Sequence, residues 1–233
     1  MAVIGQFASQ LSHEIRNPLT SIKLNLQSLE REVQAHRIPQ EYAGPIGICL
    51  REVKRLDRVA GGVLSIARTR SPERERCSVH AAVNEALEAL RSQFEERHIE
   101  VQMDLKASND TVSGDAEQLK GVFLNLFLNA SDVMPDGGSL EVASETSDEG
   151  GKARRVIRIY VADSGPGVPV EHREKIFEPF FSTKDEGTGF GLALAQQAVE
   201  EHDGTLRLED TDAPTRGAVF AVELPLDTAE QTA

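Results

Sequence analysis

Residues 12–23 read Ser-His-Glu-Ile-Arg-Asn-Pro-Leu-Thr-Ser-Ile-Lys, and this stretch lies inside a strongly periodic apolar pattern. Spacings of three and four residues repeat through the pattern, which predicts one apolar stripe along a helix. The stripe consists of Leu11, Ile15, Leu19, Ile22, Leu26, Leu29 and Val33. Because an α-helix turns by about 100° per residue, His13 falls on the opposite side, together with Asn17, Thr20 and Leu24. We expect that side to face solvent or a visiting partner.

The same pattern predicts one long helix over residues 2–35, with a local bend at Pro18, which lacks a backbone N–H. A connection at residues 36–45 contains two prolines and a glycine. A second helix is predicted from there to about residue 70, because a second stripe also steps by three and four. That stripe consists of Ile46, Cys49, Val53, Leu56, Ala60, Val63 and Ile66. Two such helices can pack as an antiparallel hairpin, and the width of the stripes favours a homodimeric four-helix bundle.

The composition changes after a short charged segment, which indicates a second domain. We expect residues 1–70 to form the helical hairpin, 71–76 a linker, 77–227 a separate domain and 228–233 a flexible tail. In the second domain, helices are predicted over 79–97, 115–134 and 190–201, and strands over 99–105, 140–144, 156–162, 205–209 and 218–224. The expected fold class is therefore a helical hairpin followed by an α/β sandwich.

The overall composition excludes several classes of protein. The 233-residue chain has a formal net charge of −13, which gives no electrostatic reason to bind nucleic acid or an anionic membrane surface. Its two cysteines, Cys49 and Cys77, show no paired spacing, so we expect reduced thiols in the cytoplasm. No apolar stretch approaches the ~20 residues that a membrane-spanning helix needs.

Two asparagines are candidates for a metal site. Asn125 and Asn129 are four residues apart in a predicted helix, so their amides project from the same side. Two amide oxygens can ligate a hard cation such as Mg²⁺, which completes its shell with nucleotide phosphates and water. The alternative is a pair of asparagines that bond to the backbone at a helix edge.

Residues 163–169 read Asp-Ser-Gly-Pro-Gly-Val-Pro and directly follow a predicted strand. Gly165 and Gly167 with two prolines fix a turn, so the Asp163 carboxylate is expected at the edge of a pocket. There it can accept a hydrogen bond from an exocyclic amine such as adenine N6. The alternative is an ordinary aspartate turn.

Residues 187–192 read Gly-Thr-Gly-Phe-Gly-Leu and stand directly before a predicted helix. Backbone N–H groups of Gly187, Gly189, Gly191 and Leu192 at a helix N-terminus favour phosphate. The spacing is not a Rossmann fingerprint, since no strand leads into it.

Just upstream, Phe177, Phe180 and Phe181 precede Lys184. We interpret this segment as a mobile lid with an aromatic hinge. The alternative is that its aromatic residues anchor a loop in the core and that Lys184 is a solvated charge.

These stretches, in this order, resemble the two-component sensor histidine kinases. The His13-Glu14-x-x-Asn17-Pro18 pattern is similar to their phosphoacceptor box, and 125–130 to the N box. Residues 163–169 and 187–192 resemble the two glycine boxes, and 177–181 the F box. The second domain is also similar to the wider superfamily of gyrase, heat-shock chaperone and mismatch-repair ATPases, known as the GHKL or Bergerat fold, whereas the hairpin is not.

The resemblance implies that His13 accepts the γ-phosphoryl group of ATP and passes it to an aspartate of a response regulator. Glu14 is then the group that takes the proton, Asn129 with Asn125 holds Mg²⁺, and Asn17 can orient water for dephosphorylation of the regulator. It also implies a homodimer, and an upstream sensor domain or sensor protein that this chain does not contain. Two other functions stay open: a dimerisation and docking module that binds nucleotide without transfer, and a protein that acts mainly as a regulator phosphatase.

Overall fold

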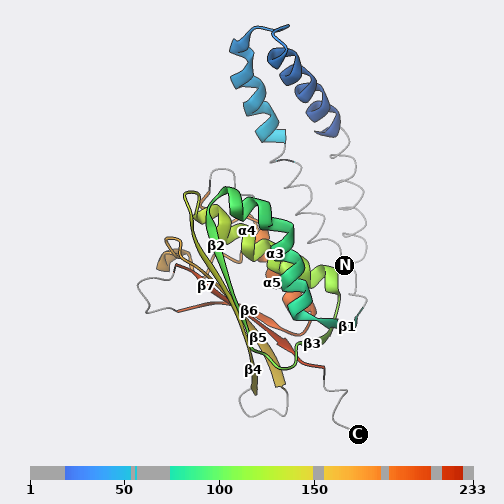
Figure 1. Ribbon diagram of the computed structural model, residues 1–233, viewed down its shortest axis with the longest axis vertical. Coiled ribbons are helices and arrows are strands. Elements are labelled where there is room, and N and C mark those ends of the chain that lie inside the picture. Colours follow the sequence, from blue (N-terminus) through green and yellow to red (C-terminus); the bar gives the residue numbers. More distant parts are fainter. Residues whose placement is uncertain are drawn as a thin grey trace. The chain divides into compact units, whose positions relative to one another are not determined.

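The structure is a computed structural model that describes residues 19–53, 56, 74–148, 155–184, 189–210 and 217–227. The chain divides into two units (Figure 1). The first, here the helical unit, comprises Met1–Arg70 with Pro179–Phe190, and the second, here the sheet unit, comprises Ser71–Glu178 with Gly191–Ala233. No helix in the described ranges is long and apolar enough to cross a membrane.

Among its described residues, the helical unit contains two helices, at residues 19–34 and 43–53, joined by a turn and the short 3-10 helix η1 (Gln40–Tyr42). Val33 of the first helix packs with Ile46 and Leu50 of the second in a small core. The predicted hairpin is therefore confirmed for this part of the chain. The start of the first predicted helix and the end of the second, with the stripe residues Ala60, Val63 and Ile66, lie outside the described residues.

The apolar stripe of the first helix has two sides with different surroundings. Leu19 and Val33 are buried, whereas Ile22 and Leu29 remain 47% and 43% exposed. Leu24, predicted on the outward side, is 58% exposed. The helix therefore packs one apolar side inside the hairpin and leaves a second apolar side open.

The second stripe also has an open side. Its residues Ile46 and Val53 are buried, whereas Cys49 and Leu56 are exposed, and Leu50, which the prediction left out of the stripe, is buried. Leu50 is four residues after Ile46 and three before Val53, so these three share the side that faces the first helix. Cys49 is rotated about 100° away from Leu50.

The sheet unit is built on a five-stranded sheet with the strand order β2-β4-β5-β7-β6. The strands are β2 (Ile99–Leu105), β4 (Gly138–Asp148), β5 (Arg155–Asp163), β6 (Thr205–Glu209) and β7 (Val219–Pro225). β2 is parallel to β4, and the other pairs are antiparallel. The helices α3 (Val79–Glu96), α4 (Ala116–Val133) and α5 (Gly191–Glu201) cover one face of the sheet (Figure 1).

The core of the sheet unit lies between this face and the helices. Alternate residues of β5, Ile157, Ile159 and Val161, are buried there, as expected for a strand with one face on the core. Phe123 and Phe127 of α4 are fully buried in the same cluster. The predicted α/β sandwich is thus confirmed, with apolar area burial as its main stabilising term.

Two short strands were not predicted from the sequence. β1 (Glu75–Ser78) pairs antiparallel with β3 (Thr111–Gly114). Each has four residues, too few for an alternating pattern to stand out. β1 also begins inside the segment predicted as a linker, so Glu75 and Arg76 lie in the sheet unit. The predicted tail 228–233 lies outside the described residues.

The first turn of α4 is capped by Asp115 and is also bonded to a residue that is distant in sequence. The Asp115 carboxylate accepts hydrogen bonds from the N–H groups of Glu117 and Gln118. A capping box would have Gln118 accept from the Asp115 N–H. Instead, that N–H donates to Nε2 of buried His202, at 2.9 Å, and His202 Nδ1 bonds to the Ala198 carbonyl. The start of α4 is therefore tied to the end of α5.

Candidate functional site

A row of three residues on α4, here called the α4 row, forms the centre of the candidate site. Asn125 and Asn129 are partly exposed, and Val133 follows them at the same spacing of four. Three residues at this spacing lie on one line along the helix. With a rise of 1.5 Å per residue, the row from Asn125 to Val133 is about 12 Å long. The opposite side of α4 is buried in the core.

The Asp163 carboxylate lies at the C-terminal end of β5, where the sequence predicts it. Its side chain is buried, with an exposed fraction of 4% for the residue. Oδ1 accepts a hydrogen bond from the Gly165 N–H at 2.8 Å and another from the Ala218 N–H at 3.2 Å. A buried carboxylate needs such donors because an uncompensated charge inside a protein is costly. These two bonds fix the plane in which the carboxylate lies.

The turn after Asp163 packs against one end of the α4 row. A Cβ atom added to Gly165 would lie 2.8 Å from Val133 Cγ2, closer than real Cβ contacts. Gly167 has a φ of +76°, which favours glycine. The two glycines of this motif therefore let the turn approach α4 closely and reverse direction.

The second glycine motif reaches the other end of the row. α5 begins at Gly191, and a Cβ atom added there would lie 3.3 Å from Asn125 Oδ1. The N-terminus of α5, whose first N–H groups have no partner within the helix, thus stands beside Asn125, while the Asp163 turn stands beside Val133. Asn129 lies between them. Leu192, the next residue, packs against the core.

Phe177 packs at the edge of the core. Its ring packs edge-on against Phe220 of β7, with ring centroids 6.4 Å apart, and it belongs to the periphery of the core. The alternative interpretation, a core anchor, therefore describes its surroundings. Any contact of Phe177 with a ligand stays a prediction.

The remaining lid residues belong to the helical unit. Phe180 is 67% exposed, contacts Phe190 with a centroid distance of 4.6 Å, and its N–H donates to the Gly189 carbonyl. A Cβ atom at Gly189, whose φ is +68°, would lie 2.3 Å from the Phe180 carbonyl carbon. The two ends of the segment between Phe180 and Gly189 are therefore in contact. Lys184 N–H bonds to Ser182 Oγ within it.

Four predicted site residues lie outside the described residues: His13, Glu14, Asn17 and Gly187. The described part of the site thus consists of the α4 row, the Asp163 turn and the start of α5. The described groove between α3 and β2 has none of these residues in its lining.

The chemistry of the three parts is complementary. A buried carboxylate at one end suits an amine donor. Amide N–H groups and the positive end of the helix dipole at the other end suit an anion. The amide oxygens between them suit a hard cation. One ligand that combines an amine, several anionic oxygens and an associated cation is a purine nucleoside polyphosphate.

Sequence reasoning missed Gly217 and Ala218. Both bond to Asp163: the Gly217 N–H donates to the Asp163 carbonyl at 2.7 Å, and Ala218 donates to its carboxylate. A Cβ atom at Gly217 would lie 2.4 Å from Asp163 Oδ1 and 2.4 Å from the Gly165 carbonyl oxygen. The only local signal is a glycine directly before a predicted strand, which by itself indicates no site.

We expect Gly217→Ala to weaken binding of a purine nucleoside polyphosphate at least tenfold, because the added methyl must displace the Asp163 carboxylate or the Gly165 backbone. Isothermal titration with such a nucleotide measures the dissociation constant. Gly121→Ala on α4 is the matched control, since a Cβ there meets nothing within 4 Å. Equal affinity in both variants would show that Gly217 does not position Asp163.

Two family models match the chain. The model described as "His Kinase A (phospho-acceptor) domain" matches residues 3–72, and that described as "Histidine kinase-, DNA gyrase B-, and HSP90-like ATPase" matches residues 114–228.

Among curated relatives, the sensor histidine kinase ZraS of Klebsiella oxytoca is 33% identical over 97% of this chain and 47% of its own length. The chain spans less than half the length of the first curated relatives it matches.

Solved structures of histidine kinases are also similar to this chain. The mycobacterial sensor histidine kinase MprB is 30% identical, with a TM-score of 0.56 over 65% of this chain and 97% of that one. The histidine kinase ThkA, solved in complex with the response regulator protein TrrA, is 25% identical, with a TM-score of 0.67 over 97% of this chain and 62% of that one.

Proposed function

Because the chain belongs to the two-component histidine kinases, we propose that it uses ATP to phosphorylate itself on His13 and then transfers the phosphoryl group to an aspartate of a response regulator. The observation that carries the proposal is the α4 row, bracketed by the Asp163 carboxylate and the N-terminus of α5. The match of residues 3–72 to the phosphoacceptor domain supports His13 as the acceptor.

The proposed binding mode assigns a role to each part of the candidate site. The Asp163 carboxylate accepts a hydrogen bond from the adenine amine, and the α5 N-terminus at Gly191 receives the phosphates. Gly187, Gly189, Leu192 and Lys184 are proposed to contact the same phosphates, and Phe177 to border the ligand. The buried position of Asp163 supports its role, because water competes less for a buried acceptor.

The proposed chemical step is an in-line displacement at the γ-phosphorus of ATP. A ring nitrogen of neutral His13 forms the new N–P bond, the P–O bond to the leaving ADP breaks, and Glu14 takes the imidazole proton. In the second step, an aspartate oxygen of the regulator displaces the His13 nitrogen from phosphorus. Asn17 is proposed to orient water when the phosphorylated regulator is hydrolysed.

Incubation of the full chain with γ-labelled ATP tests the function. We expect label on the protein that is stable in alkali and lost in acid, as a phosphorylated histidine nitrogen requires, and that moves to an added receiver domain. A chain that binds ATP but takes up no label would instead be a nucleotide-binding docking module. Acid-stable label would point to a serine, threonine or tyrosine acceptor and contradict the proposal.

We propose Mg²⁺ as the cofactor, held by Asn129 and assisted by Asn125. The donor set fits, because carboxamide oxygens are ligands that Mg²⁺ accepts beside phosphate and water oxygens. Asn125 Oδ1 also lies toward the start of α5, where the phosphates are placed. When bound, the ion neutralises charge on the phosphates.

Asn129→Ala is expected to lower the rate of self-labelling about 100-fold and to raise the Mg²⁺ concentration needed for half-maximal rate. Asn84→Ala, an exposed asparagine on α3, is the matched control and should change neither value. The decisive measurement is the initial labelling rate as a function of Mg²⁺ at saturating ATP. Unchanged Mg²⁺ dependence in Asn129→Ala would contradict the assignment.

The open apolar side of the helical unit supports a homodimer. Ile22 and Leu29 are seven residues apart and exposed, as are Cys49 and Leu56 on the second helix. A spacing of seven keeps residues on one line of a helix, as in the seam of a bundle. Burial of this line against a second copy would complete a four-helix bundle.

Leu29→Glu is therefore expected to convert the dimer into monomers, because it places a charge in the proposed seam. Leu24→Glu, which adds the same charge on the opposite side, should leave the dimer intact. Sedimentation equilibrium distinguishes the two outcomes, and a dimer that persists in Leu29→Glu would exclude this seam.

We also propose that the kinase acts in the cytoplasm and that a sensor domain or sensor protein controls it. The length of the curated relatives, of which this chain spans less than half, supports such an additional part.

A further inference from the structure

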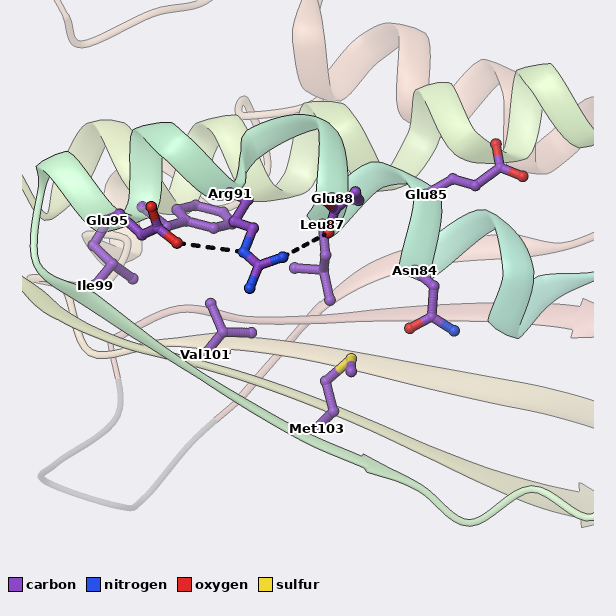
Figure 2. Close-up of a pocket in the computed structure, with 10 residues that line it drawn as sticks. Asn84, Glu85, Leu87, Glu88, Arg91, Glu95, Ile99, Val101 and Met103 are labelled. Atoms are coloured by element: carbon purple, nitrogen blue, oxygen red, sulfur yellow. Dashed lines mark hydrogen bonds and ion pairs between the residues drawn. The ribbon is translucent and has the colours of Figure 1, made fainter.

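A groove of about 760 Å³ lies between α3 and the edge strand β2, within the sheet unit. Figure 2 shows it from the side, with α3 above and β2 below. Its lining consists of Asn84, Glu85, Leu87, Glu88, Arg91, Phe94, Glu95, Ile99, Val101 and Met103. The proposed kinase reaction uses none of these residues.

The floor of the groove is apolar and partly open. Val101 and Met103 point from β2 toward α3, and Leu87 points from α3 toward them (Figure 2). Val101 is 38% and Met103 52% exposed. Side chains of this kind on the core face of a sheet are normally covered, but β2 is the outermost strand, and α3 leaves these two uncovered.

The outer edge of β2 is also unpaired among the described residues. The Lys106 N–H donates to the Ser144 carbonyl of β4. Because the N–H and C=O groups of successive strand residues alternate between the two edges, those of Val101 and Met103 point away from β4. A free edge beside an apolar floor is a template for one more strand.

The charges around this edge are predominantly negative. On the groove side, Glu88 and Glu95 share Arg91, with contacts of 3.5 and 3.3 Å. Figure 2 shows this pair of contacts along α3, above the groove. Glu100 and Asp104 lie on the opposite face of β2, because side chains alternate along a strand. Asp104 pairs with Lys106.

The same charges disfavour a second copy of this chain as the occupant. If two β2 edges paired antiparallel about Gln102, Glu100 of one copy would lie opposite Asp104 of the other. Like charges directly opposite each other in a sheet are destabilising, and the net charge of −13 adds to the repulsion. A cationic strand would bring neither like charges opposite Glu100 and Asp104 nor repulsion from the net negative charge.

We propose that the β2 edge binds an extended, cationic segment of another protein as a sixth strand. Alternate apolar side chains of this segment lie on Leu87, Val101 and Met103. The intervening Lys or Arg side chains lie on the opposite face, beside Glu100 and Asp104. Backbone bonds to Val101 and Met103 supply affinity, and the alternation of apolar and basic residues supplies specificity.

A fluorescently labelled, capped heptapeptide of alternating Lys and Val is the probe, titrated with the full chain and followed by anisotropy. We expect saturable binding, at least tenfold weaker for the corresponding Glu and Val peptide and lost when alternate backbone nitrogens are methylated. Hydrogen exchange should show new protection of the Val101 and Met103 amides in the presence of the probe.

Met103→Ser should weaken binding of the probe about tenfold, since it removes an apolar contact. Val170→Ser, which replaces an apolar residue of the sheet unit that is 75% exposed and does not line the groove, should not. Three results would each overturn the proposal: no binding of the probe, equal binding of the Lys and Glu peptides, or equal affinity of Met103→Ser and the unchanged chain.

Discussion

A chain with His13→Gln is expected to take up no label from γ-labelled ATP, while its dissociation constant for ATP stays unchanged. Glutamine keeps a polar side chain of similar length but offers no nucleophilic ring nitrogen, so no N–P bond can form. Binding is unaffected because the proposed nucleotide contacts lie on the α4 row, the Asp163 turn and the start of α5. The expected effect is therefore a complete loss of one activity and none of the other.

His36→Asn is the matched control for this variant. His36 is an exposed histidine of the helical unit with a φ of 59°, which asparagine tolerates well. It should label as the unchanged chain does. Label that persists in His13→Gln, or that disappears equally in His36→Asn, would refute His13 as the acceptor.

Asp163→Asn is expected to raise the dissociation constant for ATP about 100-fold. The carboxamide oxygen can still accept from Gly165 and Ala218, so the turn should keep its fold. The amide nitrogen, however, donates where a carboxylate accepts, and it would oppose the adenine amine. A hydrogen bond to a charged group is worth about 1.5–3 kcal/mol, and a tenfold change in affinity corresponds to about 1.4 kcal/mol.

Asp136→Asn, at an exposed position after α4, serves as the control. Calorimetric titration gives the dissociation constants, and thermal unfolding without nucleotide shows whether the fold is retained. Equal ATP affinity of Asp163→Asn and the unchanged chain would remove Asp163 from the adenine site.

Local sequence patterns predicted most of the fold and part of the site. Asn125 and Asn129 were placed on one side of a helix by spacing alone, and Asp163 at a strand end by the turn that follows it. Both features depend on residues adjacent in the chain, which is why they could be predicted.

The features that escaped prediction depend on contacts between distant residues. Ala218 and Asp163 are 55 residues apart in sequence, and no local motif marks their hydrogen bond. The Asp115 N–H is likewise bonded to His202 rather than to nearby Gln118. Phe177 was interpreted either as part of a hinge or as a core anchor, and no local pattern could decide between them, because Phe220, which lies beside it, is distant in sequence.

The roles of His13, Glu14 and Asn17 rest on the family to which the chain belongs and not on described geometry.

Tandem mass spectrometry at alkaline pH, on the full chain incubated with Mg²⁺ and ATP, identifies the phosphorylated residue. We predict one phosphoryl group, located on His13 in the fragmentation spectra and lost after brief acid treatment. A phosphoryl group on any other residue, or an unmodified chain under conditions in which ATP is bound, would contradict it.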